Sequence, residues 1–169
     1  MVWLNYFMGF DSYPNNISKS GDNNRILWSS ESYDTAKKAE NDLFKTMKYI
    51  GLREVTEDDQ KSGQVFKEPV FRVSNKKEDE EEATDCFVYD PRNGRWNRVD
   101  LTTATNPETI RKKEIRHKKL ESELGEEIKL LKIPGGVLDR ASRHCERDIN
   151  EVCNELFGVV FGLEISTEK

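Results

Sequence analysis

Apolar residues recur at helical spacing in three segments of the chain, and this pattern limits the fold more than any other feature. The first helix is expected from about Ser32 to Ile50, with Ser30 or Ser32 as its N-cap. Gly51 follows at the position where a helix commonly ends in a left-handed residue. Its apolar stripe consists of Ala36, Ala39, Leu43, Met47 and Ile50.

The last third of the chain predicts two antiparallel helices joined by the short connection Pro134-Gly135-Gly136. Asn106 and Pro107 form a typical helix start, with a cap residue followed by proline at the first position. The expected tail, residues 158–165, is either a short strand or a segment docked on the core. The stripe of the first helix is Ile110, His117, Leu120, Leu124, Ile128 and Leu131, and that of the second is Leu138, Ala141, Cys145, Ile149, Val152 and Leu156.

The segments between these helices favour β-structure. Residues 86–89 and 96–101 are rich in β-prone side chains and flank Asn93-Gly94, which is a strong hairpin signal. Further strands are expected at 2–10, 26–28 and 65–73, the last at a sheet edge or with a bulge because it contains Pro69. The predicted class is α+β: a small antiparallel sheet with one packed helix, followed by a C-terminal antiparallel helical hairpin.

The expected organisation is an α+β body over residues 1–103 and a helical hairpin with a docked tail over 106–165. Residues 75–85 contain the acidic run Glu78-Asp79-Glu80-Glu81-Glu82 and predict a mobile loop that buries nothing. The chain has 169 residues, of which 35% are apolar and 35% charged, so the core is expected to be modest and the surface highly charged.

A basic stretch from Pro91 to Lys119 stands out in a chain whose formal net charge is −5. Arginine and lysine bind phosphates, and an exposed aromatic ring can stack on an unpaired base. The alternative is a solvated helix face and a tryptophan that packs against the core. The residues that would contact nucleic acid are Arg92, Arg95, Trp96, Arg98, Arg111, Lys112, Arg116 and Lys119.

Catalytic chemistry has few candidates in this sequence. Folding the predicted helical hairpin places His117 opposite Cys153, which fits either a reactive thiol–imidazole pair or a neutral core histidine beside a buried thiol. His144 is expected to pair with Glu126 or Glu127 on the surface. A nuclease would need clustered acids around a metal ion, and the sequence shows such a cluster only in the acidic loop. No catalytic residue, metal or cofactor is therefore expected.

The function expected from these features is a non-enzymatic accessory or adaptor protein that acts through a charged protein–protein interaction surface. The alternative is a nucleic-acid-binding protein that uses residues 92–119, and the third interpretation is a hydrolase or nuclease. A protein partner is expected, and the helical hairpin could also form a homo-oligomer. Residues 1–10 are apolar but lack a basic segment and stop at Asp11, so we expect a cytoplasmic protein without membrane contact.

Overall fold

Eleven elements follow one another along residues 30–163, the part of the chain that the computed structural model describes, with side chains described from residue 34. They are α1 (Ser30–Tyr49), β1 (Arg53–Glu54), α2 (Glu57–Lys61), β2 (Val70–Val73), α3 (Lys76–Glu80), β3 (Cys86–Asp90), β4 (Arg95–Thr102), α4 (Pro107–Leu124), β5 (Ile128–Lys132), α5 (Gly135–Ala141) and α6 (Glu146–Phe161).

The five strands form one sheet in the order β1-β2-β3-β4-β5. Strands β2, β3 and β4 are an antiparallel meander, whereas β1 is parallel to β2 and β5 is parallel to β4. The α+β class is confirmed, but the predicted antiparallel sheet is matched only in part, because the sheet is mixed. The crossover through α4 is what allows β5 to join β4 in parallel.

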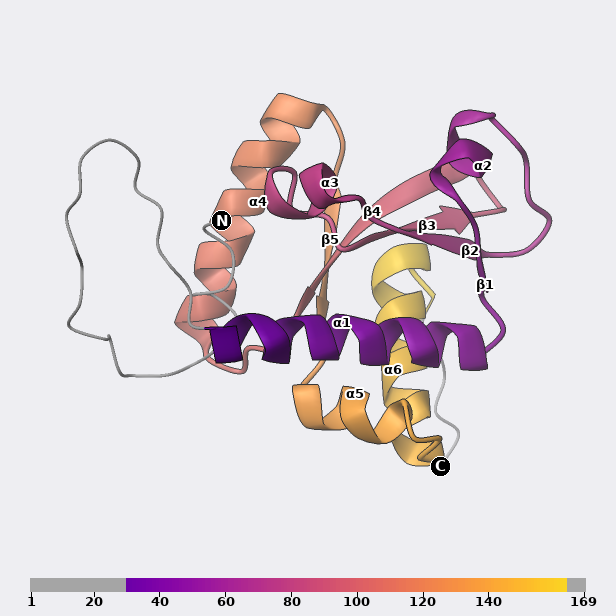
Figure 1. Ribbon diagram of the computed structural model, residues 1–169. Helices are drawn as coiled ribbons and strands as arrows, with labels where there is room; N and C mark the ends of the chain where they lie inside the picture. The colour runs from indigo at the N-terminus through magenta and orange to yellow at the C-terminus, as the bar shows by residue number, and fades with distance from the viewer. Residues whose placement is uncertain (1–29, 164–169) are drawn as a thin grey trace.

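Helices cover both faces of this sheet (Figure 1). Helices α1, α5 and α6 pack on one face of the sheet. Their apolar side chains form the main hydrophobic core together with strand residues that point to this face, including Phe71, Val88, Leu101 and Leu131. On the other face, Leu120 and Leu124 of α4 pack against Ile128 and Ala83. None of the helices between residues 30 and 163 is both long and apolar enough to span a membrane.

Helix α1 confirms the first predicted helix. The stripe residues Ala36, Ala39, Leu43 and Met47 are buried, and Gly51 has a φ of +96° just beyond the helix end. This is the left-handed region that glycine adopts without a steric penalty. The predicted serine caps are outside the described side chains.

The β3–β4 hairpin is also confirmed. Its residues pair from Cys86 with Val99 to Asp90 with Arg95, and Gly94 takes a φ of +69° in the turn. The strand predicted over residues 65–73 is shorter than expected, because β2 begins only after Pro69. The strands predicted at 2–10 and 26–28 lie outside the described residues.

The C-terminal helical hairpin was predicted with the wrong elements. Helix α4 begins as expected, with the Asn106 side chain accepting from the Glu108 amide, but it ends at Gly125, whose φ is +72°. Residues 128–132 then form strand β5 in place of the expected helix. Both Ile128 and Leu131 are buried, on opposite faces of a sheet that helices cover on both sides. A strand buried on both faces lacks the alternation that distinguishes it from a helix.

The second predicted helix is interrupted. Helix α5 ends at Ala141, the chain turns through His144 with a φ of +67°, and α6 starts after Cys145. Cys145 is exposed at the α6 N-cap, so its expected place in the apolar stripe was wrong. Residues 158–161, expected in a terminal strand or tail, belong to α6.

The acidic segment makes specific contacts with the rest of the protein, so the expectation that it buries nothing was wrong. Asn75 and Glu78 form a reciprocal capping box at the start of α3. Glu78 also accepts two hydrogen bonds of 2.8 Å from the guanidinium of Arg72, which is buried. The following residues Ala83 and Thr84 are fully buried. The segment therefore packs onto the sheet beside α4.

One ion pair links α5 to α6 at their junction. Arg140 donates from Nε and Nη2 to the two carboxylate oxygens of Asp148, at 3.0 and 2.7 Å. This pairing, with a contribution from Cys145, lowers the pKa of Asp148 to about 2. Because the unfolded pKa is about 3.9, the stabilisation is complete above that pH and is lost as the pH falls toward 2.

We expect Arg140→Met to lower the free energy of unfolding at pH 6, with a loss that shrinks as the pH approaches 3. Urea unfolding at the two pH values measures this difference. Arg143→Met is the control, because its partner Asp139 also pairs with Lys38. An Arg140→Met loss that is equal at both pH values would contradict the assigned role of the pair.

Candidate active site

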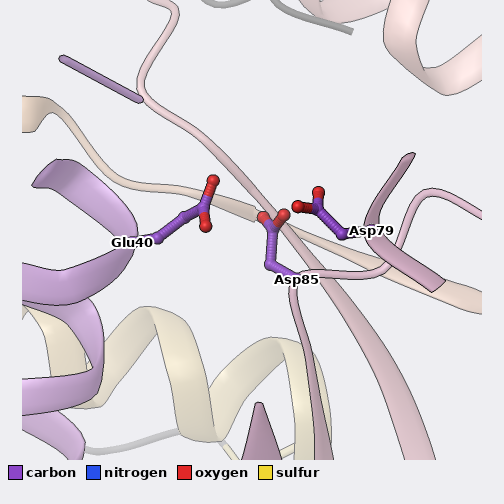
Figure 2. Close-up of side chains that lie close together, drawn as sticks. All are labelled: Glu40, Asp79 and Asp85. Carbon is purple, nitrogen blue, oxygen red and sulfur yellow. The ribbon is translucent and has the colours of Figure 1, made fainter. Parts of the chain in front are cut away.

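Three carboxylates from distant parts of the sequence converge at one edge of the sheet. Glu40 comes from α1, Asp79 from α3, and Asp85 from the residue before β3. One oxygen from each lies within 4.8 Å of the others. Figure 2 shows the three side chains pointing toward one another, with Asp85 between the other two. We call these residues the carboxylate cluster.

The fold holds two members of the cluster inside the protein. Glu40 lies on the buried side of α1, next to the apolar stripe, and is 8% exposed. Asp85 is 6% exposed, and its Oδ2 accepts a 2.6 Å hydrogen bond from the backbone amide of Leu101. The Asp85 amide donates to the carbonyl of Val99. Backbone pairing and the carboxylate together therefore hold Asp85 against β4.

Lys37 connects the two sides of the cluster. Its ammonium group donates to Glu40 Oε2 at 2.7 Å and to Asp79 Oδ2 at 2.6 Å. One partner is in the same helix and the other is in α3, so this lysine links α1 to α3. About a third of the Lys37 side chain is exposed.

A second buried group lies beside the cluster. Asp100 of β4 accepts at Oδ2 from Lys113 Nζ at 2.9 Å and shares a 2.6 Å hydrogen bond with His117 Nε2. Lys113 and His117 are one turn apart on α4, and all three residues are almost completely buried. Lys113 also donates to the carbonyl of Leu101. The Leu101 peptide therefore contacts Asp85 through its amide and Lys113 through its carbonyl.

One carboxylate oxygen of Asp100 has no hydrogen-bond partner among the described residues. Asp100 Oδ1 is buried and makes no hydrogen bond to any residue in the described part of the chain. A buried carboxylate oxygen normally accepts a hydrogen bond or binds a cation, because leaving it unsatisfied is costly. This atom is thus an unsatisfied acceptor inside the protein, on the residue whose charge also raises the pKa of Asp85.

Burial and mutual repulsion make it unfavourable for all the carboxyl groups of the site to be ionised together. Burial, followed by repulsion from Asp100 and Glu40, raises the pKa of Asp85 well above its ordinary value. Burial also raises the pKa of Glu40, although Lys37 opposes this. For Asp100, burial raises the pKa but is outweighed by the attraction of Lys113 and His117, so the net shift is downward. A cation would relieve the repulsion that remains.

Oxygen ligands of this kind suit magnesium, manganese or calcium ions. The carboxylate cluster supplies up to three such ligands. The adjacent amino group of Lys113 is a hydrogen-bond donor in a buried position, where it can stabilise negative charge that develops on a bound group. This combination of acids and a lysine is suited to hydrolysis of a phosphate ester with a metal ion.

The basic hairpin residues predicted to contact nucleic acid are mostly engaged within the protein. Arg98 pairs with Glu82 at 2.8 Å and with Glu126 at 2.5 Å, and Trp96 packs against Phe66 and Tyr89. Arg92 donates to Asp90 and to the Phe161 carbonyl. Of the four predicted hairpin residues, which are Arg92, Arg95, Trp96 and Arg98, only Arg95 has both an exposed side chain and no ion pair to a described residue.

The predicted residues on α4 present a different environment. Arg111, Lys112 and Lys119 are exposed, whereas Arg116 is half-buried. Figure 1 shows the β3–β4 turn and α4 on different sides of the molecule. The turn of the hairpin and α4 therefore do not lie side by side.

The thiol–imidazole pair is not formed. His117 contacts Asp100, while Cys153 of α6 packs with the main core on the other face of the sheet. His144 stacks on the ring of Tyr49, with 4.1 Å between the centroids, in place of the expected pairing with Glu126 or Glu127. Burial raises the pKa of Cys153, which does not favour a reactive thiolate.

Sequence reasoning missed the carboxylate cluster, although it contained a usable signal. Glu40 interrupts the apolar face of a helix, Asp85 directly precedes the strand Cys86-Phe87-Val88-Tyr89, and Asp100 lies between Val99 and Leu101. Charged residues at positions where the pattern predicts burial are rare and commonly functional. The proximity of these residues, in contrast, follows only from the tertiary fold.

Comparisons with protein families, with curated proteins and with solved structures found no match. Function must therefore be inferred from the chemistry of the site.

The raised pKa of Asp85 predicts that the ionised carboxylate lowers the stability of the fold in a pH-dependent way. A carboxyl group whose folded pKa exceeds its unfolded value of about 3.9 destabilises the fold increasingly as the pH rises above that value. Asp85→Asn removes the charge and keeps an oxygen that can accept from Leu101. We expect this variant, in a chelator, to unfold with a free energy about 1–3 kcal/mol higher than wild type at pH 8.

The stabilisation should disappear near pH 4, where the wild-type carboxyl group is protonated. Urea unfolding at both pH values tests this expectation. A variant that is less stable than wild type at pH 8 in chelator would show that the ionised Asp85 is compensated by its neighbours.

Proposed function

We propose that this protein is a divalent-metal-dependent phosphodiester hydrolase that acts on nucleic acid. The observation that carries the proposal is the convergence of Glu40, Asp79 and Asp85 within 4.8 Å, next to the buried ammonium group of Lys113. A carboxylate cluster in the protein interior needs positive charge, and a metal ion can use the same charge to activate water and polarise a phosphate.

Each residue has a role that follows from its position. The carboxylate cluster would hold the cation, and the unsatisfied Oδ1 of Asp100 would accept from the attacking water. A bound metal ion would supply Lewis acidity. Lys113 would stabilise the additional negative charge on the phosphate as the water oxygen bonds to phosphorus and the ester oxygen leaves with a proton. His117 is a positioning residue because it binds Asp100.

The preference for nucleic acid rests on α4. The segment from Arg111 to Lys119 contains six lysine or arginine residues and one glutamate. Lys113 faces the site, and the exposed Arg111, Lys112 and Lys119 lie on the same helix. A phosphate chain bound along the exposed side of α4 would lie near these cations.

This proposal places the third interpretation of the sequence ahead of the first two. The sequence disfavoured a nuclease, and predicted no metal, because it showed no acidic cluster outside the acidic loop. In the folded protein, Glu40 and Asp85 form such a cluster together with Asp79 of the acidic run. The adaptor role and simple nucleic-acid binding remain predictions, and the experiment below separates them from hydrolysis.

We expect the purified chain to cleave DNA or RNA oligonucleotides in Mg²⁺ or Mn²⁺ and to be inactive in EDTA. Asp85→Asn and Lys113→Met should each lower the rate by at least about 100-fold, because each loses an interaction worth roughly 2.7 kcal/mol in the transition state. Product formation on denaturing gels measures the rate.

Asp139→Asn is the matched control, since it removes a partly exposed acid of α5 that does not belong to the carboxylate cluster. It should retain wild-type activity. Metal-independent binding of oligonucleotides without cleavage would favour simple nucleic-acid binding. The absence of both cleavage and binding would leave the adaptor role as the stronger proposal.

A further inference from the structure

We propose that Lys37 is an internal counter-ion that occupies the carboxylate cluster at rest and competes with the divalent cation for it. This inference rests on the proposed function, because it assumes a metal ion at the cluster. It adds a mechanism that sets the metal concentration at which the site becomes loaded.

The contacts of Lys37 place it in direct competition with a metal ion. Its ammonium group donates to two of the three carboxylates that converge, Glu40 at 2.7 Å and Asp79 at 2.6 Å. A metal ion bound to Glu40 and Asp79 would occupy the space between their carboxylates that the Lys37 ammonium group occupies now. The positive charges of the metal ion and the ammonium group would also repel each other. The two cations therefore cannot both bind with full strength.

Lys37 can leave the cluster without unfolding its surroundings. About a third of its side chain is exposed, and it lies on α1 with solvent on one side. Asp79, its distant partner, is held independently because α3 is anchored by Arg72 to Glu78 and the segment after it by Arg98 to Glu82. The carboxylates should thus keep their places when the ammonium group moves away.

Neighbouring Lys38 provides an internal comparison. It carries the same charge on the same helix and also makes two ion pairs, with Asp42 at 2.7 Å and with Asp139 at 2.5 Å. Neither partner belongs to the carboxylate cluster. Removal of Lys38 consequently changes the net charge as removal of Lys37 does, but it leaves the cluster oxygens occupied.

The test measures Mn²⁺ affinity by isothermal titration calorimetry for wild type, Lys37→Met and Lys38→Met at one ionic strength. We expect Lys37→Met to bind Mn²⁺ about 5- to 20-fold more tightly than wild type, the size of a typical coupling between two ligands. Lys38→Met should stay within about twofold of wild type, as expected for an exposed charge that is screened by salt. Lys37→Gln, which keeps a neutral donor, should lie between wild type and Lys37→Met and replaces it if the methionine variant does not fold.

The outcomes distinguish this inference from the proposed function. Mn²⁺ binding by wild type with no gain in either Lys37 variant would overturn the competition but leave the metal site intact. Equal gains in Lys37→Met and Lys38→Met would also overturn it, because they would indicate a general charge effect. If neither wild type nor any variant binds Mn²⁺ at millimolar concentration, the metal site and the proposed function are both overturned.

Discussion

The hydrogen bond from the Leu101 amide to Asp85 is the interaction on which the rest of the site depends. It places a carboxylate at the point where β3 begins, directly beside β4. Burying several acids there is costly unless positive charge accompanies them. Lys37 and Lys113 approach from α1 and α4, so helices on both faces of the sheet contribute to the same small volume.

The parts of the fold that depend on neighbouring residues could be predicted from the sequence. Helix α1 was recognised from its stripe and Gly51, the hairpin from Asn93-Gly94, and the start of α4 from Asn106-Pro107. Strand β5 could not be recognised in this way. Its pairing partner, residues 98–102, is separated from it by a whole helix, and its burial on two faces produces no alternation.

The site was harder to predict than the fold because its residues are informative only together. Glu40 in a helix, Asp79 in an acidic run and Lys113 in a basic run each have an ordinary explanation as a surface charge. The acidic run also misled in a second way. High charge density favours disorder, but the buried Arg72 and the capping box provide partners that a composition argument does not see.

The contacts of the Leu101 peptide have a consequence for how the site could fail. Both are made by backbone atoms, so a different side chain at this position would leave them in place. What they require is the alignment of β3 with β4, since a slip by one residue would turn every strand side chain to the opposite face. A chain that misfolds by such a slip could retain its helices and most of its compactness while losing the carboxylate cluster. Assembly of the site therefore reports whether the hairpin has closed in the correct alignment.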